Sequence, residues 1–208
     1  MRIANSSATS IVFVLCPSIV WLLGPLLTGC AHESVPVPGT TVTAVSSGAP
    51  AAPKAPDMAP TPYTAEQLRD ANRPGTVYRY KIEAAGEPTV IKVMKFTSGG
   101  SAESAEVKDE SLDQAGQPMA PATVEHTPWE DLRRHGEFPR AALAVQPGSI
   151  EVPAGKFEVM VYTVTAPNGE VGKFYFAKSY AGPPVLLSKE RAGTRLMTMT
   201  LIERKSGG

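Results

Sequence analysis

The sequence predicts a mainly β domain: an antiparallel meander that forms a curved sheet, half-barrel or barrel, with one or two short helices. From Tyr78 onward, apolar and polar residues alternate with a period of two, which is typical of strands with one buried face. Short runs rich in Gly, Pro and Asn separate these stretches, as expected between antiparallel neighbours. A long meander either curls or folds over as a sandwich. We favour a curved sheet with a helix over its open side.

The domain is expected to begin at Tyr63 with a short helix. Residues 64–67 form a capping box, in which the Thr64 hydroxyl and the Gln67 side chain satisfy free backbone amides. The helix can run to Asn72, before Pro74 and Gly75 end it. Two strands are expected next, at residues 78–82 and 90–97, around a turn at 85–87.

The middle of the domain is expected to hold two paired strands and a second helix. The strands are predicted at residues 104–112 and 122–125, around a turn at 113–116. A second capping box at residues 127–130, with Pro128 at the first helical position, predicts a helix to about His135 that Gly136 ends. Trp129 and Leu132 then share one helix face, which would pack on the sheet.

The C-terminal part is expected to consist of short strands. Their centres are Leu143, Ile150, Val159, Phe174, Leu186 and Met199, and the predicted turns are 146–148, 153–155, 167–169, 181–184 and 191–193. The Asn168-Gly169 pair is the strongest turn signal, because it tolerates the positive φ of a tight hairpin. Aromatic residues and methionines alternate along these strands as in a β core, and a role in lining a ligand site is the alternative. They are Tyr78, Tyr80, Phe157, Phe174, Phe176, Met197 and Met199.

Residues 1–29 have the pattern of a secretory signal peptide. Arg2 supplies an early positive charge, no charged residue occurs from Ala4 to Ala31, and residues 11–27 are almost wholly apolar. As a membrane-spanning helix this run would be at the lower length limit, and its prolines would interrupt it.

The run ends in Leu27-Thr28-Gly29-Cys30, which resembles the lipobox of bacterial lipoproteins. The resemblance implies that the Cys30 thiol receives a diacylglycerol and that the signal is cut directly before it. In that family an Asp after the Cys favours retention in the inner membrane. Ala31 therefore favours lipid anchoring at the outer membrane, with the protein facing the periplasm.

Residues 30–62 are expected to be the lipidated Cys30 and a disordered tether, and residues 63–208 the β-rich domain. The tether carries seven prolines and no aromatic residue, so it cannot bury enough apolar surface to offset the entropy of ordering. The other cysteine, Cys16, lies in the part that cleavage discards. We therefore expect no disulfide, redox site or zinc site in the domain.

A second resemblance concerns three stretches of the domain, residues 152–157, 173–177 and 182–185. They resemble the C-terminal half of uncharacterised bacterial periplasmic domains with a half-barrel fold similar to the lipoprotein carriers. The resemblance implies that the concave face could hold lipid or another apolar ligand. It implies no catalytic residue.

Catalytic, cofactor and metal sites are not predicted. The 20 basic and 20 acidic residues cancel, which disfavours nucleic acid as a partner. No nucleophile elbow or phosphate-binding glycine loop is present. Five possible metal ligands gather around the second helix but match no zinc spacing, and the helix dipole explains their placement. They are Glu125, His126, Glu130, Asp131 and His135.

The function predicted from the sequence is that of a non-enzymatic, lipid-anchored envelope protein. It would serve as a binding or envelope-assembly module for an apolar ligand or an envelope protein, with the membrane as a partner through Cys30. One alternative is a hydrolase whose site is assembled from scattered residues around His126 or His135. The other is a purely structural surface lipoprotein.

Overall fold

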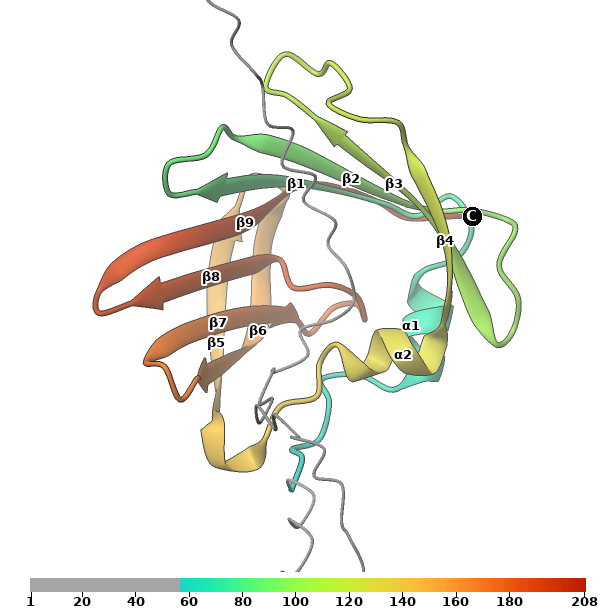
Figure 1. Ribbon diagram of the computed structural model, residues 1–208. Coiled ribbons are helices and arrows are strands. Elements are labelled where there is room, and N and C mark those ends of the chain that lie inside the picture. The colour runs from blue at the N-terminus through green and yellow to red at the C-terminus, as the bar shows by residue number, and fades with distance from the viewer. Residues whose placement is uncertain (1–56) are drawn as a thin grey trace, which may run out of the picture. The chain divides into compact units, whose positions relative to one another are not determined.

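The computed structural model describes residues 57–208, which form one antiparallel sheet of nine strands with two short α-helices against it (Figure 1). The strand order is β4-β3-β2-β1-β9-β8-β7-β6-β5, and the sheet is not closed because β4 and β5 are free edges. This confirms the predicted fold class in its open, curved form. The expected signal peptide, Cys30 and the expected tether up to residue 56 lie outside the described residues.

The helices are α1 (Ala65–Ala71) and α2 (Trp129–Arg134), and a 3-10 turn spans Arg140–Ala142. The strands are β1 (Val77–Ala84), β2 (Val90–Phe96), β3 (Ser104–Leu112), β4 (Thr123–Pro128), β5 (Leu143–Val152), β6 (Gly155–Thr165), β7 (Glu170–Ala177), β8 (Leu186–Arg191) and β9 (Thr194–Lys205). Within residues 57–208, no helix is long and apolar enough to cross a membrane.

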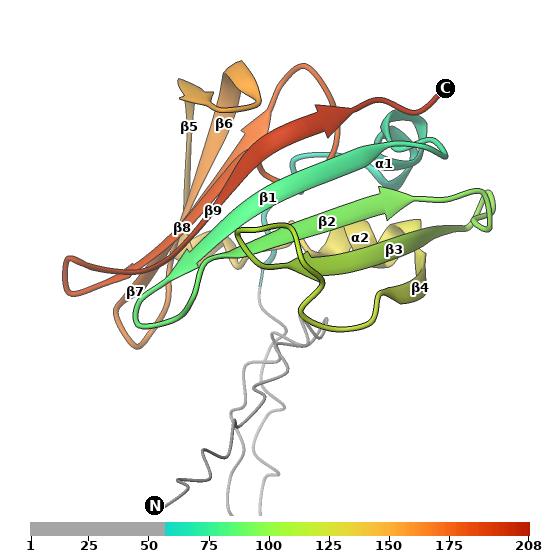
Figure 2. The same ribbon diagram turned by 90° about the horizontal axis from the view of Figure 1, so that it is seen from above.

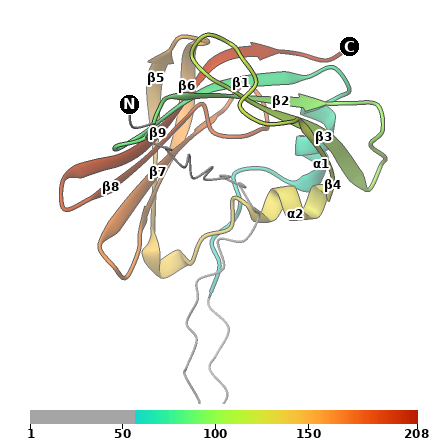
Figure 3. The same cartoon turned by 45° about the horizontal axis from the view of Figure 1, so that its top comes forward.

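Two meanders, β1–β4 and β5–β9, join into one sheet where the first strand pairs with the last (Figure 3). Tyr80 lies opposite Leu201 across this junction, and neither side chain is exposed to solvent. A bulge between Arg79 and Tyr80 shifts the register there, and bulges increase the local bend of a sheet. The junction is therefore both the centre of the core and a point where the sheet bends.

Both helices lie beneath the β1–β4 half of the sheet, as Figure 1 shows, and β2 and β3 cross over α2 when seen from above in Figure 2. The capping box at Thr64 and Gln67 is confirmed. Trp129 of α2 stacks on Phe96 of β2, with ring centroids 6.0 Å apart. Leu132 also packs against the core, so the predicted face of α2 is confirmed.

The predicted capping box of α2 is wrong. Thr127 belongs to β4, where it lies opposite Ala105, and the N-cap position is taken by Pro128 without a side-chain hydrogen bond. Extended β4 therefore runs directly into the helix. The orphan amide of Trp129 is satisfied instead by the backbone carbonyl of Glu103, at 3.0 Å.

The predicted turn at residues 146–148 is also wrong, because β5 continues through it. Pro147 lies opposite Met160 in an unbroken ladder with β6. A proline lacks the backbone N–H that a central strand needs, but β5 has a neighbour on one side only. The two predicted strands at Leu143 and Ile150 are thus one edge strand.

Contacts with the folded domain begin before Tyr63, the expected start. The Ala59 amide donates to the Phe138 carbonyl at 2.9 Å, and the Arg140 amide donates to the Asp57 carbonyl at 2.9 Å. A β-bridge joins Met58 to Pro139 between them. The segment from residue 57 to 62, assigned to the tether by composition, therefore contacts the chain that precedes β5.

Candidate ligand-binding face

Cross-strand partners in an antiparallel sheet share a face, so the register assigns each side chain to one side. Tyr80 of β1 lies opposite Leu201 of β9, and Met199, two residues earlier on β9, is on the same face. Met199 lies opposite Leu187 of β8, and Leu187 lies opposite Phe174 of β7. Phe174 in turn lies opposite Tyr162 of β6. The helices pack on this same side, through Phe96 and Tyr78. We call it the inner face.

Only part of the inner face is covered by helix. Figure 1 shows α1 and α2 beneath β1–β4, whereas β7, β8 and β9 extend away from them. From β1 through β9, β8 and β7 to β6 the inner face carries a continuous row of apolar side chains, which Phe138 of the loop after α2 joins; we call this set the apolar face. It consists of Ile82, Phe138, Tyr162, Phe174, Leu187 and Met199.

Five aromatic rings shape this part of the inner face: Phe138, Tyr162 and Phe174 belong to the apolar face, and Phe176 and Tyr63 adjoin it. The Phe174 ring centroid lies 4.9 Å from that of Phe138, and Tyr162 lies 5.2 Å from Phe176 in an edge-to-face contact. Phe174 and Phe176, two residues apart on β7, are nearly parallel at 6.3 Å. Tyr63 closes the row at the helix end by an edge contact with Phe176. These contacts fix the rings as one surface.

The apolar face is half-exposed, unlike the core beside it. Tyr162 is 8 % exposed, but Ile82, Phe138, Phe174, Leu187 and Met199 all fall between buried and exposed. The adjoining Val145 on β5, opposite Tyr162, is 45 % exposed. Contiguous apolar side chains left partly in water make this face a candidate binding surface.

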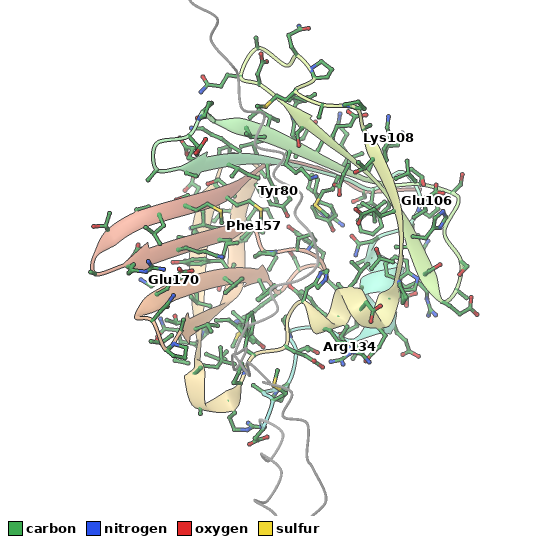
Figure 4. All side chains as sticks on the ribbon, viewed as in Figure 1. Tyr80, Glu106, Lys108, Arg134, Phe157 and Glu170 are labelled. Atoms are coloured by element: carbon green, nitrogen blue, oxygen red, sulfur yellow. The ribbon has the colours of Figure 1, made fainter. Side chains whose placement is uncertain are left out.

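A small charged cluster borders the apolar face at the free ends of the hairpins. Glu170 lies on the same side of β7 as Phe174, and Figure 4 shows it at these ends. Its carboxylate is 3.1 Å from Arg191 and 3.9 Å from Lys189. Because all three side chains are partly in water, the cluster provides a polar rim at little cost in desolvation.

Beyond the other end of the apolar face lies a tyrosine cluster, made of Tyr63, Tyr78, Tyr80 and Tyr180. Burial raises the pKa of each of these phenols above its ordinary value. The Tyr78 hydroxyl donates to the Asn72 side-chain oxygen at 2.6 Å. The hydroxyls of Tyr80 and Tyr180 are buried and have no hydrogen-bond partner among residues 57–208. Figure 4 shows Tyr80 on the inner side of β1.

The alternating aromatic and methionine residues singled out from the sequence divide between two faces. Tyr78, Tyr80, Phe174, Phe176 and Met199 lie on the inner face, as the register requires. Phe157 does not, because its position in β6 places it on the side opposite Tyr162.

Three members of the apolar face were missed by sequence reasoning: Phe138, Tyr162 and Leu187, which follows the predicted strand centre Leu186. Phe138 sits in the loop after α2, where no periodicity applies, and only the fold brings it to Phe174. Tyr162 could have been found, because it lies in the strand predicted around Val159 and takes the face opposite to Val159 and Val161.

The residues considered as metal ligands or catalytic groups are placed separately. Among residues 57–208, no three Cys, His, Asp or Glu side chains gather as a metal site. His126 pairs with Glu106 at 3.1 Å, and Glu130 and Asp131 pair with arginines of the same helix. His135 caps the end of α2. Cys30 lies outside the described residues.

Comparison with known proteins gives a weak structural likeness. No family model and no curated protein matches the chain. Among solved structures, a crystal structure of MucB matches with a TM-score of 0.47 and 14 % identity, over 69 % of this chain and 57 % of that one. A MucA/MucB complex from Pseudomonas aeruginosa matches with a TM-score of 0.48 and 12 % identity, over 66 % and 53 %. The chain thus spans little more than half of each of those chains, and we draw no argument about ligand or partner from the likeness.

Proposed function

We propose that this protein is a non-enzymatic, lipid-anchored envelope protein that binds an apolar ligand of the acyl-chain type on its apolar face. The observation that carries the proposal is the continuous set from Ile82 to Tyr162, in which every member except Tyr162 is half-exposed and which aromatic rings frame. Each methylene that such a ligand buries contributes about 0.8 kcal/mol to binding.

The position of the apolar face within the sheet favours an acyl chain over an extended peptide. β7, β8 and β9 each have a neighbour on both sides, so their backbone amides and carbonyls are already paired within the sheet. A bound strand needs free backbone groups at a sheet edge. The face therefore offers apolar contact alone, which is sufficient for a hydrocarbon chain.

The proposed location rests on the lipobox at residues 27–30 and on Ala31. We propose that Cys30 carries the lipid and anchors the protein at the outer membrane, facing the periplasm. The described domain begins at residue 57, so 26 residues separate it from Cys30 (31 to 56). The root-mean-square end-to-end distance of a flexible linker is roughly 5–6 Å times the square root of its number of residues. A tether of this length could therefore hold the domain clear of the lipid headgroups.

Ligand binding is tested with a fluorescent fatty acid and two neighbouring variants of β7. Phe174→Ala removes a ring from the apolar face, and Tyr175→Ala removes a half-buried ring from the opposite face. Losing about 1–2 kcal/mol of apolar contact weakens binding by about 5- to 30-fold in the Phe174 variant. The Tyr175 variant should bind as the unaltered protein does. Equal binding of the fatty acid by both variants contradicts the proposed face. If the protein captures an envelope protein and binds no fatty acid, the ligand is a protein and the proposed acyl-chain ligand is wrong.

Lipid anchoring is tested by metabolic labelling with an alkyne analogue of palmitate. The chain provides its own control, because Cys16 and Cys30 are its only cysteines. We expect Cys30→Ser to lose the label and to retain the N-terminal segment, whereas Cys16→Ser keeps the label. Label that persists in the Cys30 variant refutes the anchor.

A further inference from the structure

Charged and polar side chains continue the inner face beyond the apolar face, on β2, β3 and β4. Ile82, the first member of the apolar face, lies opposite Val90 of β2, and Lys92 is two residues further along β2 on the same side. Lys92 is therefore a diagonal neighbour of Ile82, at about 7–8 Å. Lys92 in turn lies opposite Ser111 of β3, and Asp109 shares that side of β3. The inner face thus changes from apolar to charged directly beside Ile82.

A second carboxylate, on β4, belongs to the same group. Asp109 lies opposite Thr123, and Glu125 is two residues further along β4, so both β4 side chains take the inner face. Burial raises the pKa of Asp109 above its ordinary value, and the charge of Glu125 adds to the rise. Register and electrostatics therefore agree that Asp109 and Glu125 are neighbours. We call Lys92, Asp109, Ser111 and Glu125 the polar patch.

The polar patch is separated from the place where α2 packs on the sheet. Trp129 of α2 stacks on Phe96. Lys92 precedes Phe96 by four residues on β2, which is about 13 Å at about 3.3 Å per residue. The side chains of Lys92 and Asp109 are nevertheless only 15 % and 19 % exposed. Two groups of opposite charge are thus largely withdrawn from water at the border of the apolar face.

The ion pair within the polar patch is loose. Nζ of Lys92 lies 3.4 Å from Oδ1 of Asp109, whereas charge-assisted N–H···O bonds measure about 2.7–2.9 Å. Within residues 57–208, this Asp109 oxygen is buried and accepts no hydrogen bond. A buried acceptor without a donor is unfavourable, so a ligand that donates a hydrogen bond to Asp109 removes this cost.

A second ion pair on the same strand provides a contrast. Lys108 and Glu110 flank Asp109 in β3 and take the opposite face of the sheet. They are 2.6 Å apart, and both side chains are more exposed than those of the inner pair. The outer pair is thus close and hydrated, whereas the inner pair is longer and leaves a buried oxygen free. The contrast singles out the inner pair as the one that a third group would complete.

The charges of the polar patch indicate which headgroup fits it. One lysine faces two carboxylates, so negative charge is in excess, and a ligand with an ammonium group offsets it. A phosphate in the same ligand can accept from Lys92. Neighbouring strands are about 4.7–4.9 Å apart, and Lys92, Asp109 and Glu125 occupy three successive strands. In phosphoethanolamine, four bonds join phosphorus to nitrogen, a span of about 5 Å at about 1.5 Å per bond. One strand spacing therefore matches the separation of its two charges.

We propose that the polar patch binds the zwitterionic phosphoethanolamine headgroup of a lipid whose acyl chain lies on the apolar face. The phosphate accepts hydrogen bonds from Lys92, and the ammonium group donates to Asp109 and Glu125. The inference rests on the proposed function, because it names the headgroup of the acyl-chain ligand. A lipid with a phosphate alone leaves the Asp109 oxygen without a donor.

Competition against the fluorescent fatty acid measures headgroup preference separately from chain binding. The probes are lysophospholipids with the same acyl chain and an ethanolamine, choline or glycerol headgroup, each below its critical micelle concentration. We expect the ethanolamine form to displace the fatty acid at about tenfold lower concentration than the glycerol form, which has no ammonium group. The choline form keeps the positive charge but has no N–H donor, so it should fall between the two.

Charge variants test the two halves of the headgroup separately. The double variant Asp109→Asn/Glu125→Gln should abolish the preference for ethanolamine over glycerol. Lys92→Gln should weaken both phosphate lipids about fivefold or more and leave that preference unchanged. The matched controls are Glu110→Gln and Lys95→Gln, which make the same kinds of change on the opposite face of β3 and β2 and should bind as the unaltered protein does.

The outcomes separate this inference from the proposed function. Equal displacement by the ethanolamine and glycerol forms, or a preference for the glycerol form, overturns the assigned headgroup and leaves the apolar face as a binding site. Control variants that lose the ethanolamine preference overturn it as well, and so does binding of the fatty acid but of no lysophospholipid. If neither the fatty acid nor any lysophospholipid binds, the proposed function itself is wrong.

Discussion

Tyr78 and Tyr80 allow a paired test of how the core is built, because the same substitution should have opposite effects two residues apart. Both side chains are fully buried on the inner face of β1. The Tyr80 hydroxyl has no partner among the described residues, whereas the Tyr78 hydroxyl donates to the buried Asn72 side chain at 2.6 Å. Replacing either residue by Phe removes one oxygen and leaves the ring.

The magnitudes follow from the cost of burying an unpaired polar group. Removing the Tyr80 hydroxyl should stabilise the domain by about 1–3 kcal/mol, since a buried hydroxyl without a partner costs that much. Removing the Tyr78 hydroxyl should destabilise it by about 1–3 kcal/mol, because Asn72, 3 % exposed, then loses its donor. The two variants should therefore differ by at least about 2 kcal/mol.

Urea unfolding followed by circular dichroism measures this difference. With a slope of about 2 kcal/mol per molar urea, the midpoints of Tyr80→Phe and Tyr78→Phe should lie about 1 M or more apart, on opposite sides of the unaltered protein. A Tyr80→Phe variant that is destabilised as much as Tyr78→Phe refutes the reasoning, because it would mean that the Tyr80 hydroxyl makes a stabilising hydrogen bond.

Three further predictions concern a turn, a carboxylate and the tyrosine cluster. Ala192 adopts a left-handed conformation, with φ 49°, beside Gly193 in the turn from β8 to β9. Asparagine tolerates this conformation better than alanine, so Ala192→Asn should raise the stability by about 0.5–1 kcal/mol, measured by thermal melting. The control is Ala85→Asn, in a turn without positive φ at that position, which should show no gain. Burial raises the pKa of Asp109 although Lys92 lies 3.4 Å away. The stability that Asp109 contributes is therefore complete below its unfolded pKa and is lost as the pH rises through its folded pKa. The melting temperature of Asp109→Asn, relative to that of the unaltered protein, should therefore rise from about pH 3 to pH 7. A difference in melting temperature that stays constant over this range would contradict the prediction. The phenols of the tyrosine cluster have raised pKa values, so they stabilise the fold fully below about pH 10 and lose that effect as the pH rises through their folded pKa values. Tyrosinate absorbance and circular dichroism should therefore change together above that pH. If all tyrosines titrate before the protein unfolds, the burial described is contradicted.

The strands could be predicted because their signal is local. Alternation at Tyr78, Tyr80 and Ile82 and the turn residues Gly155 and Gly169 depend on the nearest neighbours in the chain. The pairing of β1 with β9 could not be predicted, since it joins the two ends of the domain and leaves no local pattern. Pro147 misled for the opposite reason: its local turn signal is outweighed by its place on an edge strand.

The helix caps show the same division. Thr64 caps α1 as its sequence predicts, because nothing else competes for its backbone. The sequence after Thr127 also has the capping-box pattern, but Thr127 pairs with Ala105 of β3 and is therefore held in β4. Tertiary pairing thus overrides a local signal of similar strength.

The candidate sites depend mostly on long-range contacts. Phe174 and Met199 were visible as apolar positions, but Phe138 joins them only through the path of the loop after α2.

The central claim, that the apolar face holds an acyl chain, is tested most directly by photocrosslinking. A fatty acid with a diazirine near its methyl end is bound to the protein, irradiated, and the adducts are located by peptide mass spectrometry. We predict adducts on Phe138, Phe174, Leu187 and Met199, and their loss when unlabelled fatty acid competes. Adducts confined to the opposite face, around Val161 and Tyr175, or unaffected by competition, would contradict the account.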